Sequence, residues 1–298
     1  MLTNGETKAS HSERDKEEVV LNYPLVSIIT PVFNGKKYLE ACLQSVLNQS
    51  YPRIEHIFVD GGSTDGTLNI LSSYQSRYPE RIIFISGPDR GVGEAVNKGL
   101  AIARGQIFGW IDSDDLYKLD AISAAVEFFR ENPDAYFLFG GCNMIDEKGE
   151  VISSFTIKDF NLREALNRWH YIVFCATFFK REVVESIGLL NTLGNDLDFY
   201  IRVHKAFRMH RIEETLSSWR LHSEGISLSQ KARGKSIRRE RVKEDFLLCL
   251  KHGGSIFSPR SMRYYVTVLS PIINGLRPIL GRHYPFIKRC LGMGELYQ

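Results

Sequence analysis

Short apolar runs alternate with longer segments of helical periodicity along the first half of the chain. The apolar runs are rich in β-branched and aromatic residues and occupy residues 26–30, 54–59, 81–86 and 106–111. After the first run, apolar side chains recur at steps of three and four, at Leu39, Cys42, Leu43, Val46 and Leu47. That spacing predicts a helix with one buried face. Alternating strands and helices predict βαβ units, and therefore an α/β fold with a mostly parallel sheet.

Each predicted strand is followed by a loop rich in Gly, Asp, Asn and Ser. The sequence DGGSTDGT begins at Asp60, SGPDRG begins at Ser86, and IDSDD follows the fourth run. The carboxyl ends of parallel strands meet at one edge of an open α/β sheet, and ligands bind there. These loops therefore predict a single ligand site.

The pattern is less regular after the fourth strand. A helix is predicted at about 119–131, and Glu147-Lys148-Gly149-Glu150 predicts a hairpin turn between two strands. Further apolar runs lie at 173–179 and 215–222. We expect the first half to hold a ligand and the second half to close over it.

Composition is typical of a globular protein, with 298 residues, 43% of them hydrophobic and 24% charged. The five cysteines are scattered and show no CxxC spacing. Such cysteine usage favours a reducing compartment and hence a cytoplasmic location.

Charge is distributed unevenly along the chain. Residues 231–298 contain 14 Lys or Arg against 4 Asp or Glu, so this segment carries +10 and the preceding residues −7 of the formal total of +3. An acidic body argues against nucleic acid as a partner of the main domain, because binding to phosphates requires a positive face.

The basic C-terminal segment combines Lys and Arg with apolar residues at helical steps over residues 231–252. Residues 264–280 are apolar but contain two prolines and Arg277, and they fall short of the ~20 residues that a membrane span requires. Two interpretations are open: attachment to the cytoplasmic face of an anionic membrane, or a solvated helix that packs on the acidic body.

Three domain-level segments follow from these patterns. We expect a flexible N-terminal tail at 1–23, since this stretch is polar and lacks a signal-peptide pattern. The main domain is expected at 24–230, with a ligand-binding half at 24–118 and a second half at 119–230. A basic helical extension is expected at 231–298.

The sequence IDSDD places Asp112, Asp114 and Asp115 at the end of a predicted strand. Carboxylates this close disfavour one another's charged forms, so the cluster requires water or a cation nearby. It fits a hard divalent ion such as Mg²⁺ or Mn²⁺, which binds carboxylates together with substrate phosphates. The alternative is an Asp-rich turn that caps the next helix.

Several motifs in order resemble glycosyltransferase family 2, whose members are inverting enzymes of the GT-A fold. They cover about residues 24–228 and read VSIITPVFN, HIFVDGGSTDGT, SGPDRGVGEAVNKG, ARGQIFGWIDSDDLY, GNDLDFYIRV and WRLH. The resemblance implies a GT-A fold: a Rossmann-like, mostly parallel sheet flanked by helices, here followed by the C-terminal helical extension. A dinucleotide-binding GxGxxG motif fails, because position 96 is Val.

The resemblance also implies roles for individual residues. Asp196 is the candidate catalytic base. The metal, Mn²⁺ or Mg²⁺, is expected at Asp114, Asp115 and His222. The nucleotide-sugar donor is expected to contact Thr30, Pro31, Val32, Asn34, Asp60, Arg90, Asn97, Lys98, Asp112, Ser113 and Arg220.

Some of these positions have a purely structural alternative. Asp60 can start a turn, Asn34 can cap the first helix, and Asp196 with Asp198 can complement a helix dipole. Asp65 is expected to cap the helix that follows it. Trp110, Trp169 and Trp219 are either core residues or a platform for an acceptor sugar.

Two departures from the family pattern affect the expected site. Gly61 stands where many members carry a second acid after Asp60, and Asn195 replaces the more common Glu before the candidate base.

The predicted function is metal-dependent, inverting transfer of a hexosyl or N-acetylhexosaminyl group. The expected donor is a UDP-sugar and the expected acceptor a glycan or lipid-linked precursor in cell-surface polysaccharide biosynthesis. The alternatives are a non-catalytic nucleotide-sugar-binding scaffold on the same fold and a nucleotidyltransferase.

Overall fold

The computed structural model describes residues 23–155, 157–168, 172–191, 196–225, 235–275 and 277–281. Its contacts divide the chain into two compact units. The first comprises Met1–Asp159 and Ile172–Arg220, and the second comprises Phe160–Tyr171 and Leu221–Gln298. The expected N-terminal tail lies almost wholly outside the described residues.

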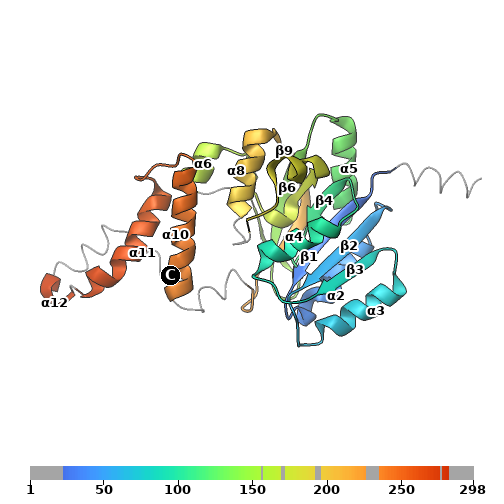
Figure 1. Cartoon of the computed structure of the whole chain (residues 1–298), viewed down its shortest axis with the longest axis horizontal. Helices are drawn as coiled ribbons and strands as arrows, with labels where there is room; N and C mark the ends of the chain where they lie inside the picture. Colours follow the sequence, from blue (N-terminus) through green and yellow to red (C-terminus); the bar gives the residue numbers. More distant parts are fainter. Residues whose placement is uncertain are drawn as a thin grey trace, which may run out of the picture. The chain divides into compact units, whose positions relative to one another are not determined.

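The first unit is built on one sheet, and its four leading strands lie where the apolar runs predict them. They are β1 (Val26–Val32), β2 (Ile54–Asp60), β3 (Ile82–Ser86) and β4 (Ile107–Trp110). They are adjacent in the order β3-β2-β1-β4, and all pair in parallel (Figure 1). Their carboxyl ends therefore share one edge of the sheet, as predicted.

The sheet continues beyond β4 with mixed pairing. The further strands are β8 (Thr177–Lys180), β6 (Phe137–Ile145), β9 (Met209–Arg220) and β5 (Leu116–Tyr117), with β7 (Val151–Ser154) paired to β6. The β6–β9 pair is parallel, whereas β4–β8, β6–β8, β5–β9 and β6–β7 are antiparallel. The predicted turn joins β6 to β7, where Gly149 adopts a φ of +92°.

Helices cover both faces of this sheet. On one face lie α2 (Lys36–Leu47), α3 (Thr67–Arg77) and α5 (Ala121–Glu131), which share buried clusters with β1, β2 and β8. On the other lie α4 (Val92–Ile102) and α8 (Asp196–Ala206). Ile28 belongs to the first face, and its neighbour Ile29 contacts α4 at Gly99, as expected because successive strand residues point to opposite faces.

Two short elements complete the first unit. A 3₁₀ turn, η1 (Phe174–Ala176), precedes β8, and α7 (Arg181–Ile187) follows it. Of the tryptophans, Trp110 is 4% exposed and belongs to the core. Trp219 is half-buried and packs against Phe155, whereas Trp169 lies outside the described residues.

The second unit is helical where it is described. It contains α6 (Leu162–Asn167), α10 (Lys235–Lys251), α11 (Pro259–Gly275) and α12 (Arg277–Leu280). Phe246 of α10 stacks on Tyr264 of α11 with ring centroids 4.3 Å apart. Among the described residues, no helix has the length and apolar character that crossing a membrane demands.

Candidate functional site

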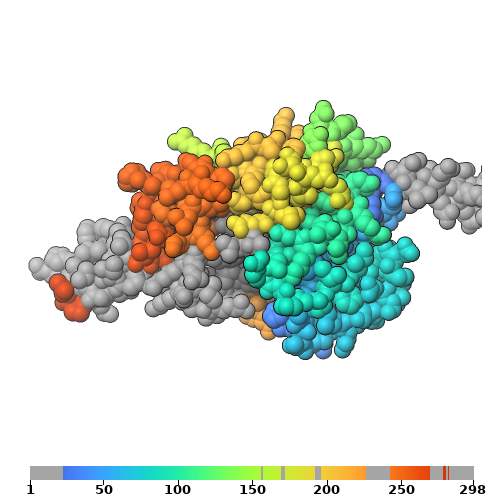
Figure 2. Space-filling model, in the orientation of Figure 1, coloured from blue at the N-terminus to red at the C-terminus, as the bar shows by residue number. Residues whose placement is uncertain are grey.

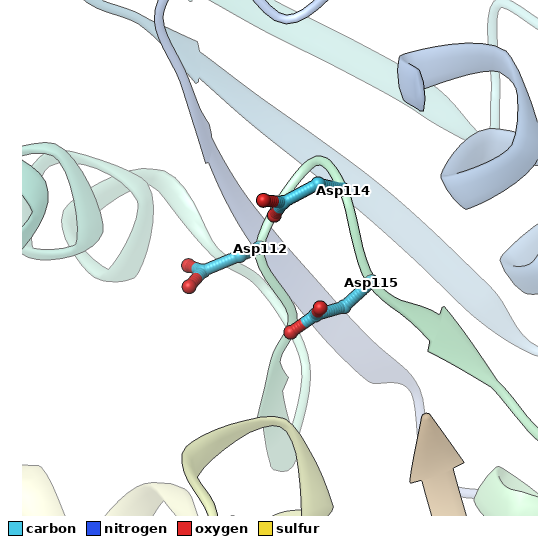
Figure 3. A group of neighbouring side chains, drawn as sticks. All are labelled: Asp112, Asp114 and Asp115. Carbon is cyan, nitrogen blue, oxygen red and sulfur yellow. The ribbon is translucent and has the colours of Figure 1, made fainter. Parts of the chain in front are cut away.

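Three aspartate side chains project from the loop that joins β4 to β5 (Figure 3). Asp112, Asp114 and Asp115 each offer a carboxylate oxygen, and these atoms lie within 4.8 Å of one another. The loop is a tight turn, in which the Asp115 amide donates to the Asp112 carbonyl at 3.1 Å. The turn therefore gathers the acids at the carboxyl edge of the sheet.

Burial and mutual repulsion raise the pKa values of two carboxyl groups in this cluster. Burial is the main cause that raises the pKa of Asp115 well above its usual value, and the charges of Asp114 and Asp112 add to it. Burial likewise raises the pKa of Asp112 to about 7, with contributions from Asp114 and Asp196. Concentrated negative charge of this kind is relieved by a bound cation.

The three acids form a donor set that fits a hard divalent ion. Mg²⁺ and Mn²⁺ prefer oxygen ligands, and carboxylates spaced this closely supply them. The helix-capping alternative does not match the structure, because α5 begins at Ala121 with Asp120 at its N-cap. The cluster instead precedes the short strand β5.

Arg220, the last residue of β9, supports the loop from the side. Its backbone amide donates to Asp115 Oδ1 at 2.8 Å, and its Nε donates to the Asp114 carbonyl at 2.8 Å. Its Nη1 donates to the Asp146 carbonyl at 3.0 Å and the Glu147 carbonyl at 3.2 Å. Arg220 thus links the acidic loop to the β6–β7 turn, and its expected contact with donor phosphates stays a prediction.

Asp196 is the first residue of α8 and lies within electrostatic range of the acidic loop, since its charge contributes to the raised pKa of Asp112. Asp198 pairs with Arg202 at 2.8 Å. Arg202 also donates to the carbonyls of Ile187 and Leu189, which fixes α8 to the end of α7. The structure therefore brings the candidate base within electrostatic range of Asp112, while Asn195 lies outside the described residues.

The residues expected at the donor in α4 and in the loop before it already have partners within the protein. Arg90 forms an ion pair with Glu94 at 2.7 Å, and Lys98 approaches the same carboxylate at 3.3 Å. The Asn97 amide donates to the Leu190 carbonyl at 2.8 Å and accepts from the Leu190 amide at 2.9 Å. In the space-filling view, the green segment of α4 and the yellow segment near residue 190 accordingly lie side by side (Figure 2).

At the end of β1, backbone atoms are better placed than side chains to contact a donor. Thr30 is wholly buried, and its hydroxyl pairs with His56 Nε2 at 2.8 Å. Pro31 and Val32 complete the strand, and Val32 is 4% exposed. Asn34 has a φ of +50° and accepts from the Thr64 amide at 2.9 Å. It is not the cap of α2, whose N-cap is Gly35.

Asp60 organises the loop after β2. It is wholly buried, and its Oδ2 accepts from the amides of Gly62 and Ser63 and from the Ser86 hydroxyl. Burial opposes ionisation, but hydrogen bonds led by Ser63 and Ser86 outweigh it and lower the pKa of Asp60. Oδ1 has no protein partner in the part of the chain that the structure describes.

Asp65, expected to cap α3, lies one residue before the N-cap Gly66, and its carboxylate joins two helices. Its Oδ1 accepts from the backbone amide of Thr67, the first residue of α3, and its Oδ2 accepts from the Lys36 amide, which opens α2. Ser113 packs against Gly35, so the acidic loop rests on the start of α2. His222 belongs to the second unit, and its expected role at the metal stays a prediction.

Two candidate residues escaped the sequence patterns. The ring of Phe33, directly after β1, is 66% exposed. Asp89, in the loop between β3 and α4, places Oδ2 only 2.9 Å from the position that a Cβ on Gly61 would occupy. A sequence shows neither the exposure of a ring nor the approach of a loop 28 residues away.

Comparison with known proteins identifies the family of this chain. The profile described as glycosyl transferase family 2 matches residues 27–188. The chain belongs to glycosyltransferase family 2. It is thus a glycosyltransferase, and the resemblance drawn from its motifs is confirmed.

Two relatives of this glycosyltransferase have names that refer to the synthesis of a glycan. TuaG of Bacillus subtilis (strain 168), whose name assigns it to teichuronic acid biosynthesis, is 34% identical over 208 residues, covering 68% of this chain and 82% of TuaG. The chondroitin synthase of Escherichia coli is 30% identical over 229 residues, covering 75% of this chain. The glycosyltransferase spans only 33% of that synthase.

Solved structures support the predicted GT-A fold. TarS from S. aureus in complex with UDP-GlcNAc matches with a TM-score of 0.57 and 18% identity, covering 83% of this chain and 73% of that one. The mannosyltransferase PcManGT from Pyrobaculum calidifontis, in complex with GDP-Man and Mn²⁺, gives a TM-score of 0.59 at 16% identity, covering 96% and 88%. The glycosyltransferase therefore has the GT-A fold.

Proposed function

We propose that this glycosyltransferase transfers a hexosyl or N-acetylhexosaminyl group, with inversion, from a UDP-sugar to a growing cell-surface glycan or its lipid-linked precursor. The observation that carries the proposal is the placement of Asp112, Asp114 and Asp115 at the sheet edge, within electrostatic range of Asp196. Metal ligands and a general base must both reach the reacting atoms. The aspartates of the loop are the candidates for the first role, and Asp196 is the candidate for the second.

Asp114 and Asp115 would hold the divalent ion, with Asp112 beside it toward the donor. When bound, such an ion stabilises the charge that develops on the leaving nucleoside diphosphate. Asp115 is fixed by the Arg220 amide, and the Asp114 backbone by the Arg220 guanidinium. The first contact holds the Asp115 carboxylate and the second holds the backbone of the loop at Asp114, so part of the site is ordered before the ligand arrives, which lowers the cost of binding.

Asp196 would accept the proton of the attacking hydroxyl. Inversion is a single displacement, so deprotonation of the acceptor accompanies formation of the new bond, and a positioned base contributes about 10²- to 10⁴-fold to the rate. Asp196 suits this role because it stands at the start of α8, which Arg202 fixes to α7.

A uridine donor and a polysaccharide acceptor are supported by relatives and by one exposed ring. TarS, which shares the fold, is seen with UDP-GlcNAc, and TuaG and chondroitin synthase are named for polysaccharide synthesis. Phe33 exposes two thirds of its surface at the end of β1 and offers a face on which a base can stack.

Donor hydrolysis and transfer with Mn²⁺ test the proposal. We expect activity in the wild type, its loss on chelation by EDTA, and its recovery when Mn²⁺ is restored. Asp114→Ala should lose activity together with metal-dependent UDP binding. Asp196→Asn should lose about 10²- to 10⁴-fold in transfer and keep UDP binding.

The products separate the alternatives. Release of UDP with the sugar transferred supports the proposal, and release of pyrophosphate identifies a nucleotidyltransferase. UDP-sugar binding without turnover across a panel of acceptors identifies a scaffold. Equal activity in wild type, Asp114→Ala and Asp196→Asn would remove the assigned roles.

A further inference from the structure

Gly61 leaves room for a carboxylate from another loop. An ideal Cβ built on Gly61 would lie 2.9 Å from Asp89 Oδ2 and 3.4 Å from Phe33 Cδ2. The first distance is shorter than real Cβ contacts, so a side chain at position 61 would displace Asp89. Residues from the ends of β1, β2 and β3 therefore converge on one point.

The Asp89 carboxylate has its two oxygens in different roles. Oδ1 accepts from the Gly91 amide at 2.8 Å, at the start of α4, and this bond orients the side chain. Oδ2 is the atom directed at Gly61. Asp89 is half-buried, so a ligand can reach its carboxylate.

Asp60 is less suited to contact a ligand directly. It is wholly buried, and three hydrogen bonds to its Oδ2 hold the loop at 62–63 and the end of β3. Asp89 is therefore more accessible than Asp60, and it lies beside the exposed ring of Phe33.

We propose that Asp89 is the specificity-determining acceptor for the nucleobase, with its Oδ2 accepting the imino N–H of uracil while Gly61 leaves the space for it. This inference rests on the proposed function, because it assigns the base of the same nucleotide donor.

The chemistry of the acceptor predicts which bases bind. Uracil presents an N–H at ring position 3, whereas cytosine presents a lone pair there. A carboxylate accepts hydrogen bonds and cannot donate one. Asp89 therefore favours UDP over CDP, two ligands that differ only at this edge of the base.

The decisive variant is Asp89→Asn, tested by calorimetric binding of UDP and of CDP with Mn²⁺ present. Asn keeps an oxygen for the Gly91 amide and places an NH₂ group where Oδ2 stood, so the loop is retained and a donor replaces the acceptor. We expect UDP binding to weaken about tenfold or more and CDP binding to strengthen, so that the preference falls or reverses.

Gly61→Ala provides an independent variant at a different residue. Its Cβ would push Oδ2 away, and we expect the same loss of preference for UDP. Gly87→Ala is the matched control: it lies at the end of the neighbouring strand, and no atom lies within 4 Å of its Cβ position. Its ratio of UDP to CDP affinity should stay within twofold of the wild type.

The outcomes separate this inference from the proposed function. A wild type that binds neither nucleotide overturns both. A wild type that binds UDP and CDP equally, or variants Asp89→Asn and Gly61→Ala that keep the wild-type ratio while unfolding at the wild-type temperature, overturns the role of Asp89 alone.

Discussion

The side chain of His56 is buried and has one hydrogen-bond partner among the described residues. It lies in β2 against the ring of Phe58, and its Nε2 pairs with the Thr30 hydroxyl. Its Nδ1 has no partner among the described residues. Burial is the main cause that lowers the pKa of His56 to about 3, and the charge of Arg81 contributes. The imidazole is therefore neutral in the folded protein.

This lowered pKa predicts that stability falls in mild acid. The unfolded chain binds a proton at His56 below about pH 6.5, and the folded chain does so only near pH 3. Stability from this residue is thus present above pH 6.5 and is lost as pH falls from there toward 3, by about 2 kcal/mol at pH 5.

Urea unfolding of wild type and His56→Gln between pH 8 and pH 5 measures this effect. The wild type should lose about 2 kcal/mol more than the variant over that range, because glutamine can pair with Thr30 but does not titrate. Identical pH dependence in the two proteins would contradict the assignment.

Helix α4 approaches the sheet at one small residue. A Cβ on Gly99 would lie 2.5 Å from Ile29 Cγ2, so only glycine permits the observed distance between helix and strand. We expect Gly99→Ala to cost about 1–3 kcal/mol in urea unfolding, even though alanine favours helices.

A double-mutant cycle tests the cause of that loss. In an Ile29→Ala background the clashing methyl is absent, so Gly99→Ala should cost little or nothing there. Equal costs in both backgrounds would show that packing on Ile29 is not responsible.

The same helix supports the segment that leads to α8. Asn97 holds Leu190 through both atoms of its amide, and α8 begins with the candidate base six residues later. We expect Asn97→Ala to lower the rate of transfer by about tenfold or more through misplacement of Asp196, with the affinity for UDP retained.

Comparison of kcat with the dissociation constant of UDP distinguishes this role from direct donor contact. A loss confined to UDP affinity would indicate instead that Asn97 contacts the donor. Asn132→Ala is a suitable control, because the side-chain amide of Asn132, the C-cap of α5, donates to the Phe128 carbonyl of that helix, far in sequence from the segment before α8.

At the scale of the whole molecule, charge separates the two ends of the chain. Residues 231–298 carry +10, and the second unit exposes apolar side chains, among them Leu247, Phe257 and Met262. Basic residues beside exposed apolar ones favour an anionic membrane surface, at about 1 kcal/mol per Lys or Arg near it.

We expect the full chain to sediment with vesicles that contain phosphatidylglycerol and not with vesicles of phosphatidylcholine alone. Raising the salt to about 0.5 M should release it, since the attraction is screened. Failure to bind anionic vesicles at low salt would favour the alternative interpretation, a solvated helix that packs on the acidic body.

Sequence patterns predicted the elements more completely than the contacts of the site. The four leading strands, the β6–β7 turn and the acidic loop lie where local sequence places them. The partners of Asn97, Arg220 and Asp89 did not follow, because these contacts join residues that are far apart in the chain. Asp60, expected to contact the donor, is buried in its own loop.

The order of residues alone determined which segments become strands and helices, and which polar loops follow them, because periodicity and turn chemistry act over a few neighbouring residues. Only the tertiary structure decided which side chains hold loops in place and which are exposed at the carboxyl edge of the sheet, where the ligand is expected. Burial and hydrogen-bond partners depend on packing between distant segments, so Phe33 and Asp89 emerged only from the structure.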